Sequence, residues 1–310
     1  MKKIFKILLF NIFGLITILT ISELVIYEHY RPKFLKYKLS YKSQVPQYMT
    51  NLEEFFNGQN NIWSGRKPDG IEYTTKNPIV IFGCSYAFGL YLNYNQTLSY
   101  KLAHELECPV YNRAISGAGF QHLYFQATSS SLYNTIKNPD TIIYIMIQDH
   151  IRRIFLNYLN ILDYPILLHY KVNNNNEFIL DNYNNKLLCF FQSLYTVKLL
   201  NHIYANKLIY NQKNSEYLTD IITLYFTRSR EELEKKWNKK LKFYIIMYED
   251  YDILHKNLLK EKLENNGFFV ISTKDLTNQN LLSEKYMMHR HPTEAAWDLL
   301  VPKIIEKLNL

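Results

Sequence analysis

The sequence predicts an α/β fold in which helices flank a mainly parallel sheet, preceded by one N-terminal transmembrane helix. Three observations support this prediction. After residue 77, short runs rich in Ile, Val, Phe and Tyr alternate with helix-like segments, as in parallel sheets. The alternation stops between about residues 155 and 240, and the N-terminal segment is apolar. A chain of 310 residues, 47% of them hydrophobic, suits one large domain, or one domain with an insertion.

The N-terminal segment has the composition of a membrane anchor. Three lysines in the first six residues precede an almost uninterrupted apolar stretch over residues 7–27, and about 20 such residues suffice to cross a bilayer. No small-residue cleavage site follows, which favours an uncleaved anchor over residues 1–30. A buried amphipathic helix carrying Asn11 and Glu23 is the alternative. Basic residues flank both ends, and we expect a single-pass protein with its domain outside the cytoplasm.

The rest of the chain divides into a connector and one domain. Residues 31–77 carry turn signals without periodicity, whereas apolar periodicity begins at residue 78. Residues 78–310 are therefore expected to form the α/β domain, with a helical insertion at about 155–240 that is either a lid over the site or a packing subdomain. The expected strands are 78–82, 109–115, 141–147, 242–248 and 268–273, and the expected helices are 96–106, 120–136, about 258–267, and a last one from residue 293.

In the stretch "IVIFGCSYAFG", a glycine directly follows the first expected strand, and a serine comes two residues later. Gly83 would let the backbone turn sharply, and Ser85 would then lie at the carboxyl end of a buried strand. A hydroxyl in that place is suited to nucleophilic attack. The alternative is a simple helix cap. A nucleotide-binding loop is disfavoured because no lysine follows Gly89.

Three further blocks follow at expected strand ends or before the last helix. They are "NRAISGAG" with Gly117, "IMIQDHIRR" with Gln148 and "HRHPTEAAW" with His291. Together with "FGCS", these blocks resemble those of the SGNH or GDSL family of esterases and acyltransferases, although no single block is specific. The resemblance runs from about residue 78 to the C-terminus outside the insertion, and implies a flavodoxin-like, three-layer fold. Cys84 stands where the family has Asp, and Gln148 where it has Asn.

The resemblance implies a role for each matched residue. Ser85 would be the nucleophile and His291 its base, because imidazole is the side chain that accepts a proton near neutral pH. The oxyanion hole would comprise the backbone N–H groups of Ser85 and Gly117 and the side-chain amide of Gln148. Such donors each contribute about 3 kcal/mol when well placed. Gln148 offers the same amide as Asn on a longer stem.

The acid of a catalytic triad is missing from its usual place. The family usually has Asp two or three residues before the histidine, where this chain has His289 and Met288. Either a backbone carbonyl holds His291 in a Ser–His dyad, or a carboxylate such as Glu284 or Asp275 reaches it from elsewhere. Loss of activity is a third alternative.

Other ligand classes find little support. The net charge is +8, but no basic stripe or nucleic-acid motif is present. Three cysteines are too few for a disulfide framework, and His289 with His291 lacks neighbours at metal-ligand spacing. We therefore expect no nucleic acid, no metal and no cofactor. Asp149 fits the N-cap of a helix as well as a catalytic role.

The sequence thus predicts a membrane-anchored ester hydrolase or O-acyltransferase. Its substrate would be an acyl ester, with acyl groups on cell-envelope glycans as the example suggested by analogy. The alternative is a catalytically inactive protein of SGNH fold that binds glycans or assists assembly.

Overall fold

A computed structural model describes the α/β domain and leaves most of the N-terminal 77 residues outside its described part. The expected anchor over residues 1–30 lies outside the described residues, as does the connector except for Glu72, Tyr73, Lys76 and Asn77. No helix in the described part of the chain is long and apolar enough to cross a bilayer. The described residues are 72–73, 76–129, 132, 136, 138–156, 170–172, 178–180, 215–248 and 256–308.

The centre of the domain is a five-stranded, fully parallel sheet, which confirms the predicted parallel α/β fold. The strand order is β2-β1-β3-β6-β7. In this flavodoxin-like order, ligands bind at the carboxyl ends of the strands, where the chain switches from one side of β1 to the other. The strands are β1 (Ile79–Gly83), β2 (Val110–Asn112), β3 (Thr141–Met146), β6 (Lys242–Met247) and β7 (Phe269–Ser272).

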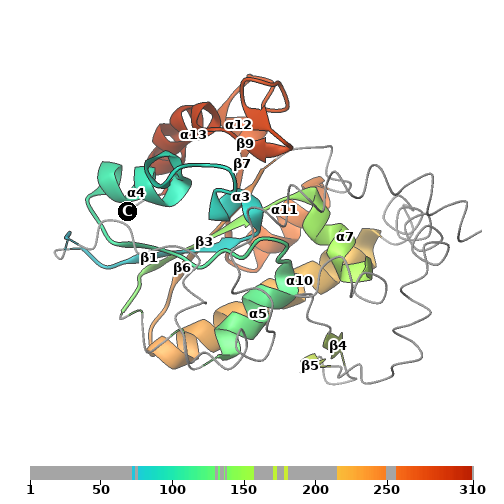
Figure 1. Cartoon of the computed structure of the whole chain (residues 1–310). Coiled ribbons are helices and arrows are strands. Elements are labelled where there is room, and N and C mark those ends of the chain that lie inside the picture. The colour runs from blue at the N-terminus through green and yellow to red at the C-terminus, as the bar shows by residue number, and fades with distance from the viewer. Residues whose placement is uncertain are drawn as a thin grey trace, which may run out of the picture.

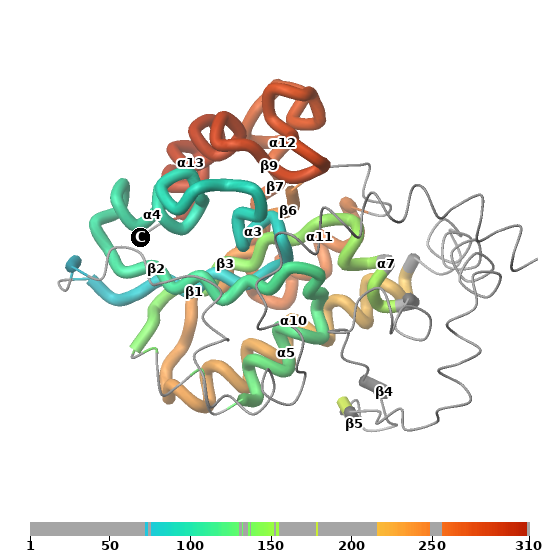
Figure 2. The backbone as a smooth tube through the Cα atoms, viewed as in Figure 1, coloured from blue at the N-terminus to red at the C-terminus, as the bar shows by residue number. Residues whose placement is uncertain are grey.

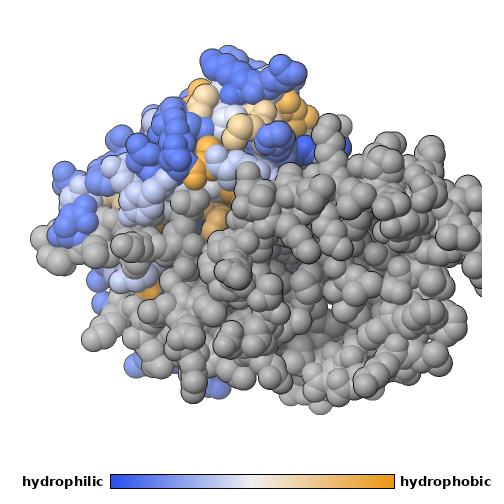
Figure 3. All heavy atoms as spheres, viewed as in Figure 1, coloured by the Kyte–Doolittle hydropathy of each residue, from blue (hydrophilic) through white to orange (hydrophobic). Residues whose placement is uncertain are grey.

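Helices cover both faces of the sheet (Figure 1). Successive strand residues point to opposite faces: Ile79 and Ile81 pack into one apolar cluster, and Val80 and Phe82 into the other. The first cluster includes residues of α4 (Leu98–Leu106) and α13 (Glu294–Lys307). The second includes residues of α5 (Phe120–Thr128), α10 (Ser215–Trp237) and α11 (Lys256–Asn265). The outer surface of the layer containing α13 is mostly hydrophilic (Figure 3).

The described part of the expected insertion contains both strand and helix. A short antiparallel pair is formed by β4 (Tyr170–Val172) and β5 (Phe178–Leu180). The α10 helix packs along α5 and contributes Phe226 to the core under the sheet. Phe178 stacks on Tyr225 of α10, with 4.2 Å between ring centroids. Thus α10, although inside the range 155–240, belongs to the helical layer of the domain.

Several short elements gather at the carboxyl edge of the sheet. The short helix α3 and the strand β9 are in contact there, although about 200 residues separate them in the sequence (Figure 2). Lys101 of α4 pairs with Asp298 of α13 at 2.6 Å, which ties together two helices that cover the same face of the sheet. The short elements are α3 (Ser85–Phe88), η2 (Tyr94–Gln96), α7 (Gln148–Leu156), α12 (Thr273–Leu276), β8 (Met287–Met288) and β9 (His291–Pro292).

Candidate active site

A sharp turn at the end of β1 places Ser85 at the carboxyl edge of the sheet. Gly83 has a φ of 147°, which side-chain-bearing residues rarely adopt. A Cβ there would lie 2.9 Å from Cβ of Ala87 and 3.0 Å from the carbonyl oxygen of Ile145, so only glycine fits. Ser85 is the first residue of α3, which ends after one turn at Gly89 with a left-handed φ of 76°. The sequence expectation of a strand, a tight turn and a serine is met.

His291 lies opposite the serine, within hydrogen-bonding distance. Nε2 of His291 is 2.9 Å from Oγ of Ser85, and Nδ1 of His291 is 2.9 Å from the carbonyl oxygen of His289. A carbonyl can only accept a hydrogen bond, so Nδ1 carries the proton and donates it. Nε2 is then left with its lone pair and accepts from the hydroxyl of Ser85. This is the tautomer that a general base requires.

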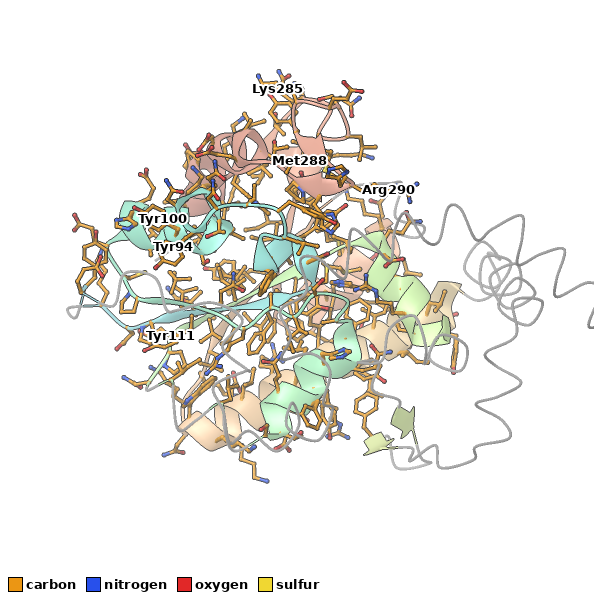
Figure 4. All side chains as sticks on the ribbon, in the orientation of Figure 1. Tyr94, Tyr100, Tyr111, Lys285, Met288 and Arg290 are labelled. Atoms are coloured by element: carbon orange, nitrogen blue, oxygen red, sulfur yellow. The ribbon has the colours of Figure 1, made fainter. Side chains whose placement is uncertain are left out.

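A tight hairpin sets the orientation of this imidazole. Strands β8 and β9 pair antiparallel, with Met288 opposite His291. The two residues between them, His289 and Arg290, have φ values of 49° and 64°. Positive φ at both central residues is the mark of a type I′ turn, and here it brings the carbonyl of His289 under Nδ1. Arg290 points away from the sheet (Figure 4).

Neither candidate carboxylate contacts the histidine. Oδ2 of Asp275 accepts a hydrogen bond from Nζ of Lys260 at 3.2 Å. Glu284 is exposed in the turn before β8. Among the described residues, the hydrogen-bond partners of His291 are Ser85 and the main chain of His289. Of the arrangements left open by the sequence, the geometry is that of a Ser–His pair held by a backbone carbonyl.

The surroundings of His291 favour its neutral form. Burial lowers its pKa below the ordinary value of 6.5, the hydrogen bond to His289 acts in the opposite direction, and the charges of Arg153 and His289 lower it further. The ring of Tyr86 lies 5.5 Å from the imidazole and that of Tyr91 lies 5.2 Å away, centroid to centroid. These rings partly shield the imidazole, which is therefore ready to accept a proton at neutral pH.

The expected oxyanion-hole residues follow the two strands beside β1. The backbone N–H of Ile115 donates to the carbonyl of Gly83 at 3.0 Å, which extends the β2 side of the ladder to the end of β1. Gly117 comes two residues later, with a φ of 84°. Gln148 is the first residue of α7 and is buried. The topology thus brings both to the edge where Ser85 lies, and their role as oxyanion donors stays a prediction.

No other reactive group described near the serine is placed as a nucleophile, a base or a metal ligand. Burial raises the pKa of the Cys84 thiol, with the charge of Arg153 opposing, so the thiol stays protonated and is a poor nucleophile. In the described part of the chain, no three His, Cys, Asp or Glu side chains are grouped as metal ligands. Asp149 is inside the first turn of α7 and pairs with Arg153 at 2.5 Å, so it is not the N-cap, which was one of its two expected roles.

Sequence reasoning assigned no role to two residues of the site, Tyr91 beside His291 and Arg153 on α7. Tyr91 adopts a left-handed φ of 71° and packs against the rings of both His289 and His291. Arg153 lies close enough to influence the pKa values of both Cys84 and His291. No motif marks Tyr91, since its strained backbone is visible only in the structure. The pair "RR" after Gln148 was the one available signal for Arg153.

Solved structures similar to this chain have low sequence identity and low TM-scores. A putative lipolytic protein of the G-D-S-L family from Desulfitobacterium hafniense is 11% identical over 75% of this chain and 100% of its own, with a TM-score of 0.42. A G-D-S-L lipolytic protein from Veillonella parvula is 13% identical over 76% and 100%, with a TM-score of 0.38. A family two carbohydrate esterase from Clostridium thermocellum, solved with cellohexaose, is 9% identical over 75% and 63%, with a TM-score of 0.40.

No protein-family model and no curated protein sequence matches the chain. The function proposed below therefore depends on the geometry and the sequence of this chain itself.

Proposed function

We propose that this protein is a serine esterase that uses a Ser85–His291 dyad. The observation that carries the proposal is the hydrogen bond of 2.9 Å between Oγ of Ser85 and Nε2 of His291, at the carboxyl edge of the sheet. The second hydrogen bond, from Nδ1 of His291 to the carbonyl of His289, fixes the required tautomer. The nucleophile thus hydrogen bonds to the base, and the base hydrogen bonds to the group that orients it.

The reaction would proceed through an acyl-serine. His291 takes the proton of Ser85 while Oγ attacks the carbonyl carbon of the ester, giving a tetrahedral oxyanion. Its collapse breaks the ester C–O bond, and the leaving alcohol takes the proton from His291. Water then attacks the acyl-serine and gives a proton to His291; the second tetrahedral oxyanion collapses with cleavage of the acyl–Oγ bond, His291 returns the proton to Oγ of Ser85, and the acid is released. The backbone N–H groups of Ser85 and Gly117 and the amide of Gln148 would stabilise the oxyanion in both steps.

The carbonyl of His289 would do part of the work of a triad carboxylate. It holds the imidazole in orientation and accepts from its Nδ1–H. A carboxylate would also attract the imidazolium formed during reaction as an opposite charge, which the neutral carbonyl does not, so the imidazolium gains less stabilisation here. We therefore expect a working enzyme that depends strongly on the orientation of the hairpin.

The proposal extends to the acceptor and the acyl group. An alcohol can replace water in the second step, which would make the protein an O-acyltransferase, and acyl groups on cell-envelope glycans suit a domain tethered outside the cytoplasm. The support is the apolar N-terminal segment of the sequence. Incubating the protein with an O-acetylated glycan and a sugar alcohol separates the cases, because free acid indicates hydrolysis and a new ester indicates transfer. Release of neither would count against this extension.

The direct test is labelling with a fluorophosphonate probe together with turnover of p-nitrophenyl acetate. Ser85→Ala should abolish labelling and lower turnover by roughly a thousandfold or more, since the covalent route is lost. The matched control is Ser229→Ala, because Ser229 is a fully buried serine of α10, away from the dyad. Its labelling and turnover should equal those of the wild type.

A folded wild-type protein that neither labels nor turns over the ester would overturn the proposal. The alternative of an inactive, glycan-binding protein would then stand, and Ser85→Ala should leave glycan affinity unchanged.

A further inference from the structure

Arg153 is a buried cation at the edge of the site that the reaction steps above leave unused. Its side chain projects from α7 and is 6% exposed. One guanidinium nitrogen donates to Oδ2 of Asp149 at 2.5 Å, and the other donates to the carbonyl oxygen of Ala118. Placing a charge in the interior costs several kcal/mol of desolvation, and Asp149 is itself partly exposed. A burial this costly calls for a reason beyond the ion pair.

The carbonyl that Arg153 binds belongs to the loop expected to supply the oxyanion hole. Ala118 follows Gly117, and the backbone N–H of Ala118 donates to the carbonyl of Ile115 at 2.9 Å. The next residue, Gly119, lies beside Arg153: an added Cβ would be in ordinary van der Waals contact with it, 3.5 Å from Cβ of Arg153. Arg153 therefore hydrogen bonds to the residue that follows Gly117 and lies beside the next one, so it is placed to hold the chain there.

A second contact joins the same two segments. The side-chain amide of Gln121, in the first turn of α5, donates to the main-chain carbonyl of Arg153 at 3.3 Å. The α7 helix is thus attached to the 116–121 segment through both the side chain and the main chain of Arg153, in the second half of the helix. Since α7 begins with Gln148, this attachment joins the elements that carry Gly117 and Gln148.

The charge of Arg153 also affects two neighbours of the nucleophile, Cys84 and His291. Burial has the largest effect on both pKa values: it raises the pKa of the Cys84 thiol and lowers the pKa of His291. Arg153 lowers the pKa of each. Cys84 precedes Ser85 in the chain, and His291 hydrogen bonds to it. A negative charge that develops beside Ser85 would lie within the field of the same cation.

We propose that Arg153 is a positioning residue of the oxyanion hole: it holds the Gly117 loop against α7 through the carbonyl of Ala118, while Asp149 of the same helix holds the guanidinium in place. The inference rests on the proposed esterase function. A guanidinium can donate to two acceptors in a fixed fork, whereas an ammonium is a point charge. Lysine should therefore supply the charge without the geometry, and an uncharged isostere should supply neither.

The experiment measures p-nitrophenyl acetate hydrolysis by the full chain and its variants Arg153→Met and Arg153→Lys. Misplacing a catalytic group by about 1 Å costs roughly a hundredfold in rate, so Arg153→Met should lower kcat by about 10- to 100-fold with little change in KM. Arg153→Lys should show a smaller loss. The matched control is Arg113→Met, since Arg113 is equally buried at the end of β2; its Tm should fall similarly while kcat stays within about threefold of the wild type.

A pH profile distinguishes the loss of the Arg153 charge from a simple loss of packing. The charged groups that act on His291 are Arg153 from α7 and His289 from its own hairpin, and the phenols of Tyr86 and Tyr91 pack against its ring. In Arg153→Met the acid limb of kcat/KM should move to higher pH, because a neighbouring cation no longer disfavours the imidazolium. In Arg153→Lys the limb should stay near that of the wild type.

The outcomes distinguish this inference from the esterase proposal. If the wild type is inactive, both fail. If the wild type is active and folded Arg153→Met keeps its kcat, only the role of Arg153 fails. Should Arg153→Met not fold, Arg153→Lys decides, since a wild-type kcat in that variant would show that the guanidinium fork is dispensable. A loss equal to that of Arg113→Met would also overturn the inference.

Discussion

The two halves of the dyad are held by very different parts of the molecule. Ser85 follows the central strand β1, whose five residues are all buried between two helical layers. His291 lies on a hairpin with two paired residues in each strand, beside an exposed turn. The nucleophile is therefore placed by the packing of the whole core, whereas the base is placed by a few local hydrogen bonds.

The acceptors of those local bonds are main-chain carbonyls. The backbone N–H of Thr293 donates to the carbonyl of Tyr286 at 2.9 Å, and the hydroxyl of Thr293 donates to the carbonyl of Lys285 at 2.8 Å. With the bond from His291 to the carbonyl of His289, they close the hairpin and aim the imidazole. Changes at the turn after β1 should thus affect mainly stability, and changes around the hairpin mainly activity.

The largest expected effect is that of Gly83→Ala on stability. The new Cβ would meet Ala87 at 2.9 Å and a backbone carbonyl at 3.0 Å, and its φ of 147° disfavours alanine. Overpacking costs about 1–3 kcal/mol, and backbone strain about another 1–3 kcal/mol. We expect the free energy of unfolding in urea to fall by about 3 kcal/mol or more.

Gly267→Ala is the matched control for this substitution. Gly267 also has a positive φ, 76°, but an added Cβ would meet only Nη1 of Arg230, at 3.4 Å. The loss there should be about 1 kcal/mol, from backbone strain alone. Equal losses at the two glycines would contradict the idea that close packing beneath Ser85 fixes the nucleophile.

A second effect, of intermediate size, is expected in the pH dependence of activity. The base must be neutral, and activity is lost as pH falls through its pKa. Burial, together with Arg153 and His289, holds the pKa of His291 below 6.5, so the acid limb of kcat/KM should have its midpoint below about pH 6.5. A midpoint above that value would indicate a carboxylate near the imidazole, because a negative neighbour raises the pKa of histidine.

The fold was largely predictable because its signals are local. Fully buried parallel strands appear as continuous apolar runs, and β3 and β6 end one residue before their expected limits at 147 and 248. The expected helix 120–136 is shorter, with α5 ending at Thr128. The serines at 129–131 are compatible with a continuing helix and do not mark its end, because the end of a helix depends on tertiary contacts.

The contact between Ser85 and His291 was predictable from the sequence, but the group that holds the imidazole was not. Ser85 and His291 were found from motifs, and they meet at 2.9 Å. The partner of Nδ1 is a carbonyl, which every residue possesses, so its position depends on the φ values of His289 and Arg290 and has no sequence signature. The contact of Arg153 with Ala118 joins segments 35 residues apart, and the order of residues alone does not indicate it.

The smallest expected effects are those of Asp275→Asn and Glu284→Gln on turnover. Asp275 pairs with Lys260 near the surface, and such pairs contribute at most about 1 kcal/mol to stability. Glu284 is exposed before the hairpin. Because a main-chain carbonyl holds the imidazole, kcat for p-nitrophenyl acetate should stay within about twofold of the wild type in both variants, whereas loss of a triad carboxylate lowers kcat by about ten-thousandfold. A hundredfold loss in either folded variant would mean that a carboxylate moves to His291 during reaction, and the hairpin would then not be sufficient to place the base.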